Sequence, residues 1–193
     1  MRKKNRNATP EYLTEESEIN VENYTYFVGI DPSYSSTGLV VLRSDSDEPL
    51  VAISIKAGAP HEFFYKRLKK LLDKLDEVVL SYPIDDIYVV MEGAAFASEF
   101  AAFKLGKLSG VIEYHLGTLG IDYSLVAPTY VKKVATGSGA ADKKKVMEGV
   151  KQRWGFTHIC NDITDAYAMA QIAKGAKPIS KKVPKKSRER AKM

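Results

Sequence analysis

The stretch from residue 27 to residue 42, FVGIDPSYSSTGLVVL, constrains the fold of this chain more than any other segment. Two runs rich in β-branched and aromatic residues flank a polar turn, which predicts a β-hairpin. Asp31 ends the first run, and Gly29 and Gly38 leave the neighbouring backbone open to close approach by another segment. Because Asp-Pro also starts ordinary turns, Asp31 alone is compatible with a purely structural turn.

The rest of the chain alternates between strand-like and helix-like segments. Residues 50–56 predict a third strand of an antiparallel meander, and residues 87–92 and 122–127 predict two more strands. Helices are expected over 62–80, 97–119, 128–134, 141–154 and 162–174. This order predicts an α/β fold with a mixed five-stranded sheet flanked by helices.

Two of the expected helices have features that bear on packing. In the helix over 62–80, Phe63 and Phe64 belong to an apolar face at 3.6-residue spacing, which we interpret as core packing and not as a functional feature. In the helix over 97–119, Gly106 and Gly110 share one face. Because each glycine costs about 1 kcal/mol in a helix relative to alanine, this pair indicates close approach by another backbone, within the fold or across a dimer.

Bulk properties limit the class of protein. A chain of 193 residues is long enough for one domain with a real core and too short for two large lobes. It contains no run of about 18 apolar residues, so we expect no membrane partner. The single cysteine, Cys160, excludes an internal disulfide and suits a reducing cytoplasm.

Charge divides the chain into three parts. Residues 1–23 are polar and predict a flexible N-terminal extension, residues 24–174 hold the expected domain, and residues 175–193 predict a basic disordered tail. The segment from Lys174 to Met193 holds nine basic residues and one acid, although the whole chain has a net charge of only +5. Such a tail is typical of an electrostatic arm for a polyanion, and a solubilising or nuclear-import tail is the other interpretation.

Three further acids are candidate partners of Asp31. Glu92 ends the strand-like run over 87–92, and Asp162 and Asp165 lie three residues apart on one helix face. Acids at the start of a helix are also favoured by the helix dipole, so this pair alone does not define a site. If the two acid-ending strands are neighbours, a helix laid across their ends brings all four acids together.

A cluster of this kind predicts a metal site. Clustered carboxylates repel one another, and burial disfavours their charged forms, so a cation is needed to compensate them. Oxygen ligands without histidine or thiolate select Mg²⁺, for which Mn²⁺ can substitute. A pair of such ions is the arrangement that supports phosphodiester hydrolysis.

A lysine-rich loop provides candidate phosphate contacts. Residues 131–146 read VKKVATGSGAADKKKV, in which a glycine loop leads into a helix N-terminus. This pattern suits contact with a nucleic-acid backbone, although a solvated helix face would also explain the lysines. The candidate DNA-binding lysines are Lys132, Lys133, Lys143 and Lys144.

Four segments, taken in order, resemble the RuvC-type Holliday junction resolvases of the ribonuclease H-like superfamily. They are GIDPSYSSTG, VVMEGAAF, VKKVATGSGAADKKKV and NDITDAYAMA, and the similarity extends from Tyr26 to about Lys174. The resemblance implies a ribonuclease H-like sheet. Charged extensions on a compact, divergent member are typical of phage and viral genomes, which would place the protein in a host cytoplasm.

The resemblance implies a homodimer, formed through the helix over 97–119, that binds four-way DNA junctions and nicks two opposing strands. Nicking would leave 5′-phosphate and 3′-hydroxyl ends, and forks and other branched DNA are further expected substrates. By the same matching, Lys132 and Lys143 correspond to the family's two functional lysines, the second close to the scissile phosphate. The residues that match the family's metal ligands, for two Mg²⁺ ions, are Asp31, Glu92, Asp162 and Asp165.

One family feature is shifted in this sequence. The family's junction-facing aromatic residue follows the glutamate by three positions, whereas Phe96 follows Glu92 by four. Phe96 and Phe100 are therefore both candidates for the contact that separates the strands.

Two other functions are compatible with parts of the sequence. The pattern Gly-Ile-Asp followed by Thr-Gly also resembles the phosphate loop of actin-type and sugar-kinase ATPases, which need two lobes that 193 residues do not provide. A non-catalytic module that binds branched DNA through its basic tail is the second alternative. It predicts binding without Mg²⁺ and no strand scission.

Overall fold

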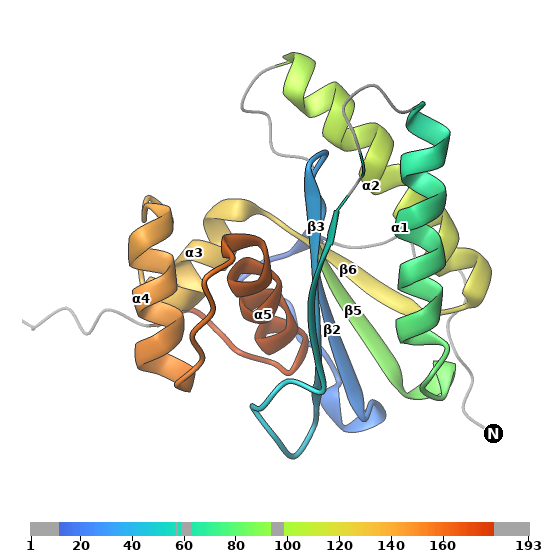
Figure 1. The fold of residues 1–193 in the computed structure, drawn as a ribbon. Helices are drawn as coiled ribbons and strands as arrows, with labels where there is room; N and C mark the ends of the chain where they lie inside the picture. Colours follow the sequence, from blue (N-terminus) through green and yellow to red (C-terminus); the bar gives the residue numbers. More distant parts are fainter. Residues whose placement is uncertain (1–11, 57, 59–62, 94–98, 180–193) are drawn as a thin grey trace, which may run out of the picture.

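The computed structural model describes residues 12–56, 58, 63–93 and 99–179 (Figure 1). The strands of these residues form one mixed sheet in the order β1-β6-β5-β2-β3-β4. β2, β3 and β4 form an antiparallel meander, whereas β5, β6 and β1 continue the sheet in parallel with β2. The strands are β1 (Tyr12–Leu13), β2 (Tyr26–Asp31), β3 (Ser36–Arg43), β4 (Val51–Lys56), β5 (Ile87–Glu92) and β6 (Asp122–Val126).

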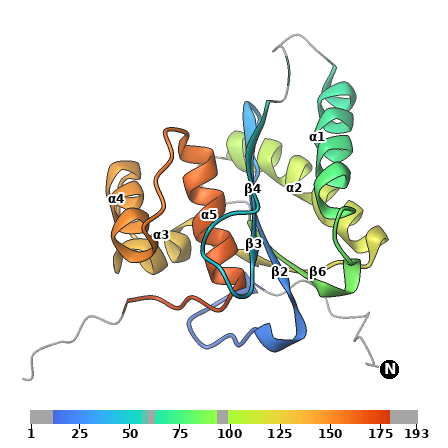
Figure 2. The same cartoon turned by 60° about the horizontal axis from the view of Figure 1, so that its bottom comes forward.

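Helices cover both faces of the sheet. α1 (Phe64–Val79) and α2 (Glu99–Leu119) lie on one face, and α3 (Pro128–Thr136), α4 (Lys143–Trp154) and α5 (Asn161–Ala173) lie on the other (Figures 1 and 2). Two short 3₁₀ segments, η1 (Val21–Asn23) and η2 (Ile84–Asp86), precede β2 and β5. The predicted α/β class with a mixed sheet is confirmed. No helix in the described residues is long and apolar enough to span a bilayer.

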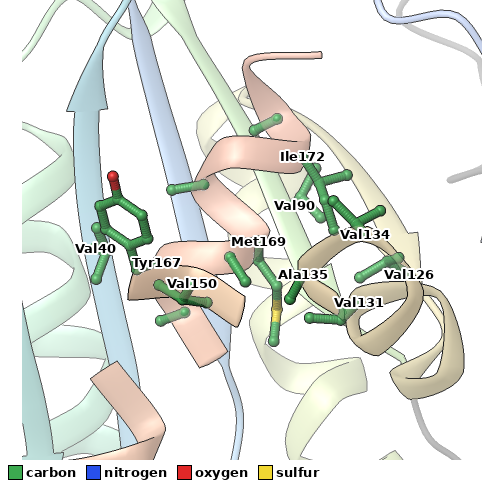
Figure 3. Close-up of a cluster of buried hydrophobic side chains, with 14 of the residues drawn as sticks. Val40, Val90, Val126, Val131, Val134, Ala135, Val150, Tyr167, Met169 and Ile172 are labelled. Carbon is green, nitrogen blue, oxygen red and sulfur yellow. The ribbon is translucent and has the colours of Figure 1, made fainter. Parts of the chain in front are cut away.

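Strand alternation builds a separate core on each side of the sheet. In β2, Val28 and Ile30 pack with α1 and α2, whereas Phe27 belongs to the core under α3, α4 and α5. Figure 3 shows the second core, where Val40 of β3 lies beside Tyr167 of α5 and Val90 of β5 lies near Met169. Because β2 and β5 are buried on both faces, their positions are rigidly set, and so are the residues that end them.

The sheet has six strands and not the five that were expected, because Tyr12 and Leu13 pair in parallel with β6. These two residues fall within the segment predicted as a flexible extension, yet Leu13 is only 8% exposed and belongs to the core. Two residues are too short a run to show strand periodicity in a sequence. Pairing with the otherwise open edge of β6 places them in the sheet.

The interpretation of α1 as a core helix is correct for its later turns and wrong for its start. Leu71, Leu75 and Val79 are buried, but Phe63 is 71% exposed and Phe64 is 37% exposed. The apolar spacing therefore extends beyond the part of the helix that the sheet covers. Phe63 precedes the first helical residue, and the start of α1 reaches the edge of the sheet.

Candidate active site

Two neighbouring strands end in an acid at the same edge of the sheet. β2 and β5 pair in parallel, with Ile30 opposite Met91, and the next residue of each strand is Asp31 and Glu92, respectively. Because parallel strands end on one side of a sheet, these two carboxyl groups start from adjacent positions. The condition on which the sequence argument depended, that the two strands be neighbours, is met.

Two glycines place the third element of the site. A β-carbon at Gly29 would overlap the main chain of Ala166 and Ala170, and one at Gly38 would overlap the main chain of Asp162. α5 thus lies directly on the backbone of β2 and β3, as the predicted close approach at these glycines requires. This contact brings the first turn of α5, with Asp162 and Asp165, toward the end of β2.

The electrostatics of the acids agree with the placement of β2, β5 and α5. Burial, followed by repulsion from Glu92, Asp165 and Asp162, raises the pKa of Asp31 to about 8. Burial and repulsion from Asp165 raise the pKa of Glu92 to about 7. Burial also raises the pKa of Asp165, and Asp162 adds to this shift. The acids from β2, β5 and α5 therefore form one electrostatically coupled group.

Two lysines partly offset this negative charge. Lys143 is the first residue of α4, whose N-terminus is capped by the Asp142 side chain accepting from Lys145 N at 2.9 Å. Lys143 lowers the pKa of Asp31, Glu92 and Asp165, and Lys132 of α3 lowers the pKa of Glu92 and Asp165. Lysines on both sides of the glycine loop thus act electrostatically on the acid group.

The structure describes the side chains of two of the four other predicted DNA contacts, Lys133 and Lys144. Lys133 forms an ion pair with Glu15 of the N-terminal segment. Lys144 is exposed on the first turn of α4. Phe96 lies outside the described residues, and for Phe100 the structure describes the backbone, within α2, but not the side chain.

Ser36 joins the site although the sequence argument did not select it. Its hydroxyl donates a hydrogen bond to the Asp162 carboxylate from the first position of β3. The sequence shows only a serine at the end of a polar turn. The contact arises because α5 crosses β3 next to Gly38, two residues beyond Ser36. Ser36 therefore fixes the orientation of one of the four acids.

The donor chemistry of the group fits a hard divalent cation. All four candidate ligands are carboxylates, and burial, followed by repulsion from neighbouring acids, raises the pKa of Asp31 and Glu92. Mg²⁺ and Mn²⁺ prefer oxygen ligands of this kind. Among the described residues, no three His, Cys, Asp or Glu side chains are arranged as a formed cation site. By their chemistry, the four acids are the candidate ligands for such a cation.

The pKa shifts predict how stability depends on pH in the absence of metal. Between about pH 4 and pH 8, Asp31 keeps its proton in the native state but has lost it in the unfolded state, where its pKa is near 3.8. The stability that this proton contributes is therefore fully present below about pH 4 and is lost as the pH rises toward 8. In EDTA, we expect the free energy of unfolding to fall by about 3 kcal/mol between pH 5 and pH 8, measured by urea titration.

Two comparisons test that prediction. Asp31→Asn should flatten the pH dependence in EDTA and should be more stable than the native chain at pH 8. Mg²⁺ should stabilise the native chain at pH 8 and have little effect on this variant, since only the native site binds the ion. A stability in EDTA that rises from pH 5 to pH 8 would contradict the assignment of a repelling acid group.

The fold and the site together define a ribonuclease H-like protein, in which acids from two adjacent parallel strands meet a helix laid across the sheet. Solved structures show the same fold. The Thermus thermophilus RuvC structure matches with a TM-score of 0.62 at 23% identity, covering 80% of this chain and 99% of that chain. T. thermophilus RuvC in complex with Holliday junction substrate matches with a TM-score of 0.63 at 23% identity, covering 81% and 100%.

Sequence comparisons then identify the family. The family model for crossover junction endodeoxyribonuclease RuvC matches residues 27–173. RuvC of a Nitratiruptor species is 31% identical over 147 residues, which cover 74% of this chain and 91% of the relative. RuvC of Rickettsia felis is 30% identical over 147 residues, covering 74% and 93%. This chain belongs to the RuvC family, and the resemblance seen in its four motifs is confirmed.

Proposed function

We propose that this protein is a Mg²⁺-dependent endonuclease that resolves four-way DNA junctions by paired nicking and also cuts forks and other branched DNA. Its curated relatives are crossover junction endodeoxyribonucleases. The observation that carries the proposal is geometric: β2 and β5 end side by side in Asp31 and Glu92, and α5, with Asp162 and Asp165 in its first turns, rests on the backbone of β2 and β3. An ATPase is disfavoured, since the matched family includes the hairpin that suggested it.

Each acid has a proposed role. Asp31, which is repelled by the other three, would hold or bridge the ions together with Asp165. Glu92 and Asp162 would complete the ligand set, and the hydrogen bond from Ser36 would orient Asp162. Two bound Mg²⁺ ions would supply Lewis-acid stabilisation of charge at the attacking and leaving oxygens. The protein itself would contribute the fixed strand ends and an all-oxygen donor set that favours Mg²⁺ or Mn²⁺ over Zn²⁺.

The lysines and the tail would bind the DNA backbone. Lys143, next to the acid group, would contact the scissile phosphate, and Lys132 a neighbouring one. Lys133 would exchange Glu15 for a phosphate, and Lys144 would add a peripheral contact. Phe96 or Phe100 would separate strands at the junction, and the basic residues 175–193 would serve as a non-specific electrostatic arm.

A homodimer would place two active sites on one junction. α2 exposes Phe103 at 61% and Tyr114 at 75%, which is unusual for large aromatic side chains. A β-carbon at Gly106 or Gly110 would meet no atom within 4 Å in the described part of the chain. The face of α2 that carries these two glycines is therefore open. The close approach inferred from these glycines does not occur within the described part of the fold. Packing of α2 against a second copy would supply it.

Removal of the metal tests this function directly. The protein is incubated with end-labelled four-way, forked and linear duplex DNA, with Mg²⁺ or with EDTA. We expect symmetric nicks in the four-way junction with Mg²⁺, slower cutting of forks, and no cutting of linear duplex. EDTA should abolish cutting, and excess Mg²⁺ should restore it. Binding of all substrates without any scission would support the non-catalytic DNA-binding module instead.

A further inference from the structure

An exposed aromatic surface, here called the aromatic ledge, lies at the start of α1. It consists of Tyr34, Phe63, Phe64 and Tyr65. Phe63 is 71% exposed and Tyr65 is 63% exposed, and their rings stack with centroids 6.1 Å apart. Tyr34 and Phe64 stack with centroids 5.6 Å apart and an interplanar angle of 12°. Large apolar rings at this level of exposure mark an interaction surface more often than a packing defect.

The ledge is attached to the turn that follows Asp31. Tyr34 lies in this turn, three residues after Asp31, between β2 and β3. Arg67 of α1 donates a hydrogen bond to the Tyr34 carbonyl, and its guanidinium lies 5.5 Å from the centre of the Tyr34 ring. The start of α1 and this turn lie at the same end of the sheet (Figures 1 and 2). The ledge is therefore continuous with the edge that carries the acid group.

The charge around the ledge favours a polyanion. The first turns of α1 contain Lys66, Arg67, Lys69 and Lys70, and the first turn contains no acid. Cations at a helix N-terminus oppose the helix dipole, so this arrangement is unfavourable unless an anion compensates it. The Arg67 Nε atom is buried and has no hydrogen-bond partner among the described residues. Lys69 forms an ion pair with Asp73 at 2.7 Å, and Lys66 and Lys70 lie beside it on the same helix.

We propose that the aromatic ledge stacks unpaired DNA bases next to the cut site, while the α1 lysines contact the adjoining backbone. Flat aromatic faces beside cations are the surface that binds single strands, because every base has a face that can stack. This inference rests on the proposed nuclease function and specifies its substrate. The ledge would make the protein favour branch points that expose unpaired nucleotides over fully paired duplex.

A binding experiment separates the ledge from catalysis. The double variant Phe63→Ala, Tyr65→Ala is titrated in EDTA against a fork with unpaired arms and against linear duplex of equal length. We expect fork affinity to fall at least about ten-fold and duplex affinity to change less than about two-fold, since stacking acts only on unpaired bases. Leu80→Ala, a 52% exposed position at the other end of the same helix, is the control and should bind as the native chain does. Phe63→Trp, Tyr65→Phe should retain fork binding.

The possible outcomes separate failure of the ledge proposal from failure of the proposed nuclease function. A fluorescent base analogue in the fork arm should be quenched on binding by the native chain and not by the double alanine variant. If this variant binds fork and duplex with native affinity, the ledge proposal is wrong although junction cutting can still be intact. If its mass in solution falls below that of the native chain, the ledge is an interface between copies and the proposal is likewise overturned. Absence of cutting by the native chain would instead refute the nuclease function.

Discussion

Asp31→Asn is expected to abolish cleavage of a synthetic four-way junction while leaving junction binding intact. Asp31 ends β2 beside Glu92 and under the start of α5, and each of the other three acids raises its pKa. Asparagine retains the shape of the side chain but removes its charge and one ligand oxygen. We expect the cleavage rate with Mg²⁺ to fall at least about a thousand-fold, equivalent to about 4 kcal/mol of transition-state stabilisation. Single-turnover cleavage of end-labelled junctions measures this rate.

The matched control removes an acid away from the site. Asp45 pairs with Arg43 on the exposed loop that joins β3 to β4. Asp45→Asn should cleave at the native rate, because it changes the net charge by the same amount but leaves the acid group unchanged. Binding of both variants is measured by fluorescence anisotropy in EDTA. Cleavage by Asp31→Asn at the native rate would remove the basis of the active-site assignment.

Gly29→Ala is expected to produce the largest loss of stability. The added methyl group would overlap the main chain of Ala166 and Ala170, and main-chain atoms of a packed helix cannot rotate out of the way. α5 would have to move off β2, where it contributes Met169 and Tyr167 to the core. We expect the free energy of unfolding to fall by about 3 kcal/mol or more, measured by urea titration.

A second glycine, Gly117, provides a control for which the expected change in stability has the opposite sign. A β-carbon at Gly117, within α2, would meet no atom within 4 Å in the described part of the chain. Gly117→Ala should raise stability by up to about 1 kcal/mol, because alanine is the better helix former. If Gly29→Ala were as stable as the native chain, α5 would not rest on the β2 backbone. The proposed route by which Asp162 and Asp165 reach the site would then be lost.

Local patterns in the sequence sufficed to predict much of the fold and to select four acids as candidate ligands. Strand periodicity gave β2 through β6, and the acids at the ends of two strands and on one helix face were visible as isolated signals. The sequence could not show that β2 and β5 are neighbours, because strand order is set by long-range pairing. Only the tertiary structure therefore places the acids of the two strands and of the helix at one edge of the sheet.

The features that were missed all depend on what another part of the chain covers. β1 was missed because two residues gain their strand character only from the open edge of β6. The exposure of Phe63 was missed because apolar spacing does not reveal where the sheet ends beneath α1. The ion pair between Lys133 and Glu15 was missed because Glu15 is distant in the sequence. The sequence by itself determined which chemical groups the protein has and the local structure that carries them. The tertiary structure decided which groups meet, because burial, pairing and charge coupling act between segments far apart in the chain.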